Sequence, residues 1–378
     1  MRKLVYCCLT LFLLCCKDKY DAPVNTPVTG YLVIEGFIST NGPAELQLSR
    51  SIPLDDTAQL IRETMASVRL QGRDNTTYNL IENGPGRYFI NNLNLNTNQQ
   101  YKLSIRSRDG KEYESDYVSP KIAPQIDSVG WIRDNGGVQI YINTHDPKNN
   151  TWYYRWTTEE TWEFHSSFYT SLDFARNSEK RIIGITYRKP DQSIDEKFYT
   201  CWRDQNSTSL ILGSSKKLSV DSIHKPLIYI EPRSWKLSVL YTVLVKQYAL
   251  SKEEYEFLDK MKKNSEETGS FFGRQPSELK GNIRCITNPN EPVIGFIGIA
   301  NRMEKRIWIK RSEVPDWGYT QDCFTYTVFT DSAEIYSYLM PTVPIEYDNG
   351  AVKTYLGVSP VCVDCTLRGV NTKPSFWP

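Results

Sequence analysis

Runs in which apolar and polar residues alternate follow one another in the first third of the chain, and this pattern predicts short β-strands. In one run, Tyr101, Leu103 and Ile105 alternate with polar residues, so we expect one buried face and one wet face. An Asp-Gly pair at 109–110 is typical of a hairpin turn. Seven such runs without a helical pattern predict an immunoglobulin-like β-sandwich over residues 30–120. The predicted strands are 31–38, 44–49, 66–71, 77–81, 86–90, 100–107 and 112–118.

A second β pattern begins after the prolines at 120–124 and predicts a larger β-rich domain over residues 121–378. One helix interrupts it. Ser251 and Glu254 have the spacing of a capping box, and an apolar face continues to about residue 265, so we expect a helix near 251–265. A cysteine-containing tail rich in turn residues closes the domain. The strands expected here are 126–129, 138–142, 152–156, 196–202, 209–212, 228–230, 236–249, 283–287, 293–300 and 306–310.

The N-terminus predicts export. Two basic residues precede an apolar run over 4–14, which is too short to span a bilayer and is typical of a signal peptide. The run ends at Cys16, which follows a small residue as in a bacterial lipobox. We therefore interpret residues 1–16 as a lipoprotein signal peptide and lipobox with the lipid on Cys16, and residues 17–29 as a tether. A signal peptide without lipidation is the alternative.

Charge and motif content exclude several classes of function. Removal of residues 1–15 leaves 43 basic and 44 acidic side chains, so no basic excess favours a nucleic-acid partner. Only three histidines are present, and no metalloprotease, nucleophile-elbow, P-loop or dinucleotide motif occurs. The sequence therefore predicts no catalytic residue, no bound metal and no cofactor, and we expect a protein that is not an enzyme.

Five cysteines beyond Cys16 fit an oxidising compartment, where we expect most of them to pair and one to be left over. The spacing at 362–365 is also that of a redox or zinc motif. The segment does not follow a strand at the start of a βαβ unit, however, and so we favour structural disulfides over both alternatives. The disulfide candidates are Cys201, Cys285, Cys323, Cys362 and Cys365.

Aromatic residues are dense between 152 and 169. Such side chains can stack on sugars or peptides while polar neighbours fix the ligand's orientation. The alternative is that one face of a strand is core. The segment 164–189 has no clear period, and we expect a long loop with functional contacts there. The candidate binding residues are Trp152, Tyr154, Trp156, Trp162 and Tyr169.

Several blocks together resemble one family of exported lipoproteins. They are Tyr-Leu-Val-Ile-Glu-Gly at 31–36, the segments 123–129, 250–257 and 269–276, and the ending with Cys-Val-Asp-Cys at 362–365 and Lys-Pro-Ser-Phe-Trp at 373–377. In these blocks the chain resembles the Bacteroidetes-type outer-membrane lipoproteins named domain of unknown function 4249. The resemblance implies lipid anchoring at the outer membrane and a gene often placed beside a TonB-dependent receptor. No established catalytic site comes with it.

The leading hypothesis is an outer-membrane lipoprotein that assists a TonB-dependent receptor in nutrient capture. Asp18 and Asp21 resemble the acidic signals that place such lipoproteins on the cell surface, although Lys17 and Lys19 dilute them. We therefore expect a surface-facing, lipid-anchored protein. One alternative is a free-standing surface protein that binds glycans or peptides, and another is a hydrolase or thiol enzyme. The identity of the small-molecule, glycan or peptide ligand is left open.

Overall fold

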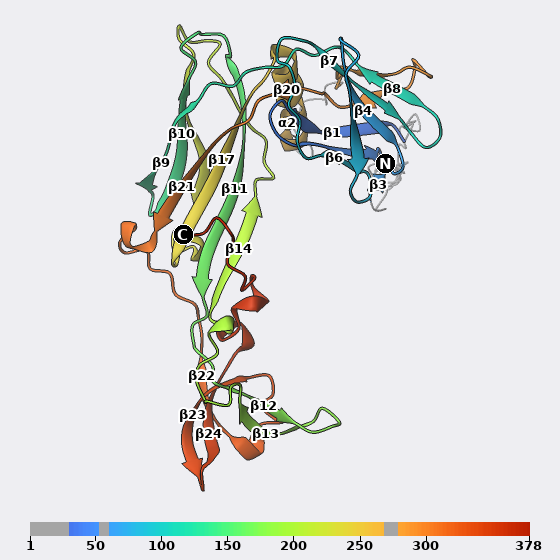
Figure 1. Cartoon of the computed structure of the whole chain (residues 1–378). Helices are drawn as coiled ribbons and strands as arrows, with labels where there is room; N and C mark the ends of the chain where they lie inside the picture. Colours follow the sequence, from blue (N-terminus) through green and yellow to red (C-terminus); the bar gives the residue numbers. More distant parts are fainter. Residues whose placement is uncertain (1–29, 53–59, 268–278) are drawn as a thin grey trace, which may run out of the picture.

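The computed structural model describes residues 30–52, 60–267 and 279–378, and it confirms a mainly β chain with one α-helix in the described part. The predicted signal peptide, Cys16 and the tether lie outside the described residues. Figure 1 shows three parts, which we call the first, central and distal modules. The distal module lies at the end of the central module that points away from the first module (Figure 1).

The first module contains the seven predicted strands within a few residues of their expected bounds. Residues 77–80 pair with one neighbouring strand and residues 81–82 with another, so β5 passes between two sheets. Leu32 of one sheet and Leu103 of the other are both fully buried in one core. The strands are β1 (Leu32–Ser39), β2 (Ala44–Arg50), β3 (Ile61–Arg62), β4 (Ser67–Gly72), β5 (Thr77–Glu82), β6 (Arg87–Ile90), β7 (Tyr101–Arg106) and β8 (Glu112–Ser115).

Three short strands from much later in the chain complete this module. They are β18 (Ile283–Cys285), β19 (Val293–Ile294) and β20 (Ile299–Ala300). β18 pairs with β8, and both β19 and β20 run parallel to β1. The sequence predicts strands at 283–287 and 293–300 but groups them with the second domain, because a local pattern does not show that they pair with strands more than 150 residues earlier. The immunoglobulin-like topology is not confirmed.

The central module packs two sheets around a core of large aromatic and branched side chains. Every second side chain of the long strand β11 from Tyr154 to Phe164 is buried, and Tyr154, Trp156 and Trp162 point into this core. One sheet has the order β16 (Ser222–Ile230), β10 (Gly137–His145), β9 (Ile126–Asp134). The other has the order β14 (Thr200–Asn206), β11 (Tyr153–His165), β17 (Leu240–Ala249), β21 (Met303–Lys310), with β15 (Ile211–Ser214) paired to β11.

The helix α2 (Lys252–Glu267) lies between the first and central modules (Figure 1). Its capping box forms as predicted, because the Ser251 hydroxyl accepts a hydrogen bond of 3.0 Å from the Glu254 amide. The Tyr255 ring lies 5.0 Å from Tyr153 of the central module, and Phe257 lies 5.7 Å from Phe296 of the first. The helix thus joins the two modules through apolar contacts.

The distal module combines two distant chain segments around a small core. Leu172 and Phe174 from one segment pack with Val328 and Tyr355 from the other. The sequence predicts a long loop over 164–189, and this prediction is wrong, because residues 172–187 of the segment form a β-hairpin. The strands are β12 (Leu172–Arg176), β13 (Ile182–Tyr187), β22 (Thr325–Phe329), β23 (Met340–Asp348) and β24 (Ala351–Val358). Short 3₁₀ turns occur at η1 (Glu196–Phe198), η2 (Trp235–Leu237), η3 (Arg311–Glu313), η4 (Thr330–Ser332), η5 (Pro360–Cys362) and η6 (Cys365–Leu367).

Two disulfides attach the segment after β24 to different modules. Cys365 pairs with Cys201 of β14 in the central module, and Cys362 pairs with Cys323 just before β22. Cys285 is a buried free thiol. The prediction that most of these thiols pair and one is left over is therefore confirmed. The two cysteines at 362 and 365 do not pair with each other, which rules out a local redox pair.

Candidate functional site

Most of the predicted aromatic binding region is core. Tyr154 and Trp156 are fully buried and Trp162 is 2% exposed. Hydrogen bonds fix the first two, because the Tyr154 hydroxyl donates to Asp221 over 2.9 Å and the Trp156 indole donates to Gln247 over 2.9 Å. A strand with a strict period of two presents one face to the core, and these residues occupy that face. They are therefore unavailable to a ligand at the surface.

The remaining two predicted residues do not come together. Trp152 is half-buried at the start of β11, where the Lys216 ammonium lies 4.9 Å from its ring. Tyr169 follows the other end of that strand, is 43% exposed and stacks on Tyr199 at 3.8 Å. A strand of this length spans about 40 Å, so the two side chains belong to separate surfaces.

Exposed aromatic residues gather instead on the distal module. Between residues 324 and 347 of this module, eight large apolar side chains are each more than 40% exposed, and Ile335 and Phe324 exceed 70%. Large exposed apolar side chains concentrated on one small module are candidates for an interaction site. We call this set the distal aromatic surface. Its members are Phe324, Tyr326, Phe329, Ile335, Tyr336, Tyr338, Ile345 and Tyr347.

The distal aromatic surface lies in the most acidic part of the chain. From residue 312 to residue 352 the sequence contains no lysine, arginine or histidine. The acidic residues in that range are Glu313, Asp316, Asp322, Asp331, Glu334, Glu346 and Asp348. A surface of this kind attracts cationic partners through its net charge and its aromatic faces.

Local structure holds the distal aromatic surface in place. Val328 and Tyr355 pair across β22 and β24 and point into the core, while the Cys323–Cys362 disulfide fixes the chain just before β22. The Tyr336 and Tyr338 rings lie 6.2 Å apart. Phe-Thr-Tyr-Thr-Val-Phe at 324–329 alternates like a strand, and this was the signal in the sequence that could have located the surface.

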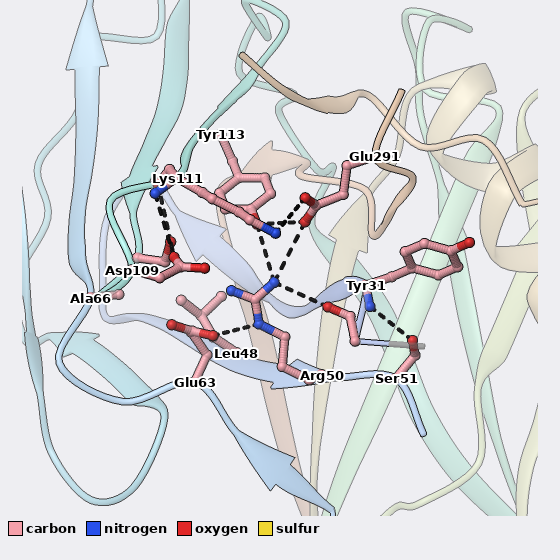
Figure 2. Close-up of polar contacts among 12 residues, drawn as sticks. Tyr31, Leu48, Arg50, Ser51, Glu63, Ala66, Asp109, Lys111, Tyr113 and Glu291 are labelled. Carbon is pink, nitrogen blue, oxygen red and sulfur yellow. Dashed lines mark hydrogen bonds and ion pairs between the residues drawn. The ribbon is translucent and has the colours of Figure 1, made fainter. Parts of the chain in front are cut away.

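A second notable group is a partly buried polar cluster where the described chain begins (Figure 2). Arg50 donates to Glu63 over 2.5 Å, to the Tyr113 hydroxyl over 3.1 Å and to the Gly30 carbonyl over 3.2 Å. The Tyr113 hydroxyl donates to Glu291 over 2.7 Å. Lys111 donates to the other oxygen of Glu291 over 2.6 Å. Through these contacts Arg50 fixes residue 30, which follows the predicted tether.

The charged and polar groups of the cluster compensate one another. Burial, and then the hydrogen bond to Glu291, raise the pKa of Tyr113, so its hydroxyl stays protonated. Burial acts to raise the pKa of Glu291, but the hydrogen bonds from Lys111 and Tyr113 outweigh it and hold that pKa below its usual value. Because its polar groups satisfy one another, this cluster serves to position the chain rather than to bind a ligand.

A cleft of about 660 Å³ lies between the 120–125 linker and the turn after β10. It contains one acid–base pair, in which His145 Nδ1 lies 2.7 Å from Asp127. The hydrogen bond that His145 donates to the Asp127 carboxylate raises the pKa of His145. Thr151 also lines the cleft, but its hydroxyl donates to Asp146 over 2.9 Å. Among the described residues, no group of side chains has the composition of a metal site.

Comparison with known families identifies the chain. The model of the family described as domain of unknown function (DUF4249) matches residues 17–306. The protein belongs to this family. The matched range ends before β22, so the strands that carry much of the distal aromatic surface lie beyond it.

No curated protein matches this DUF4249 chain. Among solved structures, it is similar to a chitinase from Bacillus thuringiensis, with 9% identity and a TM-score of 0.15 over 52% of this chain and 29% of the chitinase. It is also similar to a proposed carbohydrate-binding protein from Bacteroides uniformis, with 7% identity and a TM-score of 0.14 over 74% of this chain and 98% of that one. At these TM-scores neither likeness informs the fold or the function. None of the helices in the described ranges is long and apolar enough to cross a membrane.

Proposed function

We propose that this protein is a non-catalytic, lipid-anchored outer-membrane protein that assists a TonB-dependent receptor, and that the distal aromatic surface contacts the partner. The observation that carries the proposal is the exposure of eight large apolar side chains on one small module. Protein interfaces are enriched in aromatic side chains at their centres, where a few such residues carry most of the binding energy.

The energetic argument follows from exposure to water. A tyrosine or phenylalanine side chain offers about 150–250 Å² of surface, and burial of apolar area contributes about 25 cal/mol per Å². Tyr338 is 65% exposed and Phe329 is 54% exposed, so the unbound protein leaves most of this gain unrealised. A partner that covers the surface would recover it.

The predicted anchor supports work close to a membrane. A tether over 17–29 reaches at most about 45 Å when fully extended. Arg50 holds the Gly30 carbonyl at 3.2 Å, so a tether would enter the folded body at a fixed point. The resemblance to lipoproteins encoded beside TonB-dependent receptors supplies the kind of partner.

The anchor is tested by substitution at Cys16. Cys16→Ser removes the acceptor for the lipid, so metabolic lipid labelling should be lost and the protein should leave the membrane fraction. Cys15→Ser is the matched control, because serine is a small residue that a lipobox accepts before the modified cysteine. Lipid labelling that survives Cys16→Ser contradicts the assignment of the lipid to this residue.

The partner is tested by purification of the tagged protein from native membranes in a mild detergent. A β-barrel receptor should co-elute, and Tyr338→Ser should weaken the complex by roughly 30-fold, the effect of losing an interface side chain worth about 2 kcal/mol. Ile132→Ser is the control, since Ile132 is 52% exposed but lies on β9 of the central module. Recovery of the lipoprotein alone, also after crosslinking, contradicts the proposal.

A free-standing glycan binder is the second candidate, favoured by one observation. Tyr169 is 43% exposed and stacks on Tyr199, which leaves one aromatic face open for a sugar ring. Binding of an oligosaccharide to the purified protein without any receptor, lost on Tyr169→Ala, would favour this function over the first.

A further inference from the structure

We propose that the free edge of β22 binds an extended, lysine- or arginine-rich segment of the partner as an added β-strand. The inference rests on the proposed function and specifies the chemistry of its partner. It begins with the position of β22 in the three-stranded sheet β22-β24-β23, in which β22 hydrogen-bonds only to β24 among the described residues. An edge strand turns every second N–H and C=O away from its neighbour, and these groups form a template for another strand.

Water reaches this edge. Four of the five residues of β22 are exposed, and Val328 is the one that is buried. Tyr326 is 52% exposed and Phe329 is 54% exposed. Both residues belong to the distal aromatic surface, so a strand added here would pack its side chains against aromatic rings that are already in place.

The opposite edge of the same sheet is protected, and β22 is not. β23 contains Pro341 and Pro344, and its pairing with β24 shifts register three times. Prolines and bulges are the devices by which natural proteins prevent edge strands from pairing. The sequence of β22 is Thr-Tyr-Thr-Val-Phe, without a proline, a charge or a register shift. Within one small sheet, one edge is therefore blocked and the other is open.

The charge around β22 determines the chemistry of the added strand. Asp322 precedes the strand, and Asp331 and Glu334 follow it, with no basic residue between 312 and 352 in the sequence. Lys353 on the paired strand β24 lies 3.7 Å from Glu346, so an acidic side chain offsets its charge. An acidic or neutral strand would lack complementary charge here. A basic one gains ion pairs at both ends and cation–π contacts with the exposed rings. The occupant that fits is a segment in which basic residues alternate with β-branched ones.

Peptide binding to the full-length mature lipoprotein in detergent tests the backbone contribution. The probe is an end-blocked peptide of alternating lysine and valine. It should bind with an affinity that falls as salt rises. The same peptide methylated on every backbone nitrogen keeps its charges and loses its donors, and it should bind about tenfold more weakly or worse. Equal binding of both peptides means that charge alone is recognised, and this result overturns the inference.

A protein variant tests the same edge. Thr327→Lys places a lysine on the open edge at an exposed position, and it should reduce peptide binding by about tenfold or more. Ile183→Lys is the matched control, because it adds the same charge at a side chain that is 67% exposed on the neighbouring hairpin. If Thr327→Lys destabilises the module, Thr325→Lys serves in its place. An equal loss of binding in the Ile183→Lys control overturns the inference.

Receptor recovery separates this inference from the proposed function. If Tyr338→Ser lowers co-purification of the receptor and Thr327→Lys leaves it unchanged, the receptor-assisting role stands and strand addition at β22 is wrong. The β12–β13 hairpin of a second copy, which contains Arg176, Lys180 and Arg181, is the other occupant of suitable charge. Dimers in sedimentation that dissociate on Thr327→Lys would assign the edge to that second copy and overturn the choice of a partner segment.

Discussion

At the residue scale, Arg50 connects three separate parts of the first module through one side chain. It contacts the Gly30 carbonyl, Glu63 and the Tyr113 hydroxyl, and it lies 3.6 Å from Glu291. The side chains of Arg50, Glu63 and Glu291 are at most 12% exposed. Loss of one partner from such a buried set leaves opposite charges uncompensated, and this costs more than the intact pairs contribute.

Arg50→Met should therefore lower the free energy of unfolding by about 3–5 kcal/mol, as measured in urea. The control is Lys102→Met, which removes a more exposed ion pair with Glu114 and should cost about 0–1 kcal/mol. An equal loss of unfolding free energy in the two variants would show that the buried cluster contributes no more to stability than a more exposed ion pair.

The aromatic residues of β11 show the limit of sequence reasoning at this scale. The alternation around Trp156 predicts a strand, and the strand is there. Its composition does not reveal that both sheets of the central module close over this face, because that depends on partners such as Gln247, 91 residues away. Exposure of a side chain is a property of the packed molecule, and local pattern therefore could not separate the core from a binding surface.

At the element scale, helix α2 contains a buried carboxyl group, that of Glu254. Burial raises the pKa of Glu254 to about 7, although its hydrogen bond to the Ser251 amide and nearby positive charges act against this shift. In the pH range between its usual value and 7 the folded protein holds a proton that the unfolded chain releases. The contribution of Glu254 to stability is therefore complete below the usual pKa and is lost as pH rises to about 7.

Glu254→Gln keeps the capping geometry and cannot ionise, so it should remove this pH dependence. Between pH 5 and about pH 8, the free energy of unfolding of the native protein should fall relative to that of the variant by up to about 3 kcal/mol. Glu253→Gln, at an exposed position of the same turn, should leave the dependence intact. Parallel profiles for the native protein and Glu254→Gln would contradict the raised pKa.

The two disulfides stabilise different modules, so we expect their removal to destabilise different strands. Removal of the Cys323–Cys362 bridge by serine at both positions should destabilise the distal module by about 2–4 kcal/mol. Hydrogen exchange should accelerate in β22 and β24 while β11 stays protected. Removal of the Cys201–Cys365 bridge should give the opposite pattern. Uniform acceleration in both variants would mean that the modules unfold as one unit.

The strands missed from the sequence share a physical cause. In the first module, hairpin neighbours with a clear period of two build the sheets, and the predicted bounds agree closely with the structure. The distal module is made of β12 and β13 together with β22, β23 and β24, more than 130 residues later in the chain. Residues 324–329 alternate like a strand, but neither segment alone has enough buried residues to show which strands it pairs with. Their core exists only when the two segments meet.

At the scale of the whole molecule, the module next to the proposed anchor is not the module proposed to contact the partner. The first module receives the chain at residue 30, the central module and α2 form a packed body, and the distal module presents the aromatic surface at the far end (Figure 1). The family match ends before the strands of that surface begin. We therefore expect partner choice to depend on the distal module, and exchange of residues 320–363 between family members should transfer it.

Site-specific photo-crosslinking in intact cells tests the central claim most directly. A photoreactive residue at Tyr338 or Phe329 should capture one discrete partner, and mass spectrometry should identify it as a β-barrel receptor. The same residue at Ile132 on the central module should capture nothing at comparable yield. Crosslinks of equal yield from all three positions, or no crosslink from the distal aromatic surface in cells that retain the lipoprotein, would contradict the account.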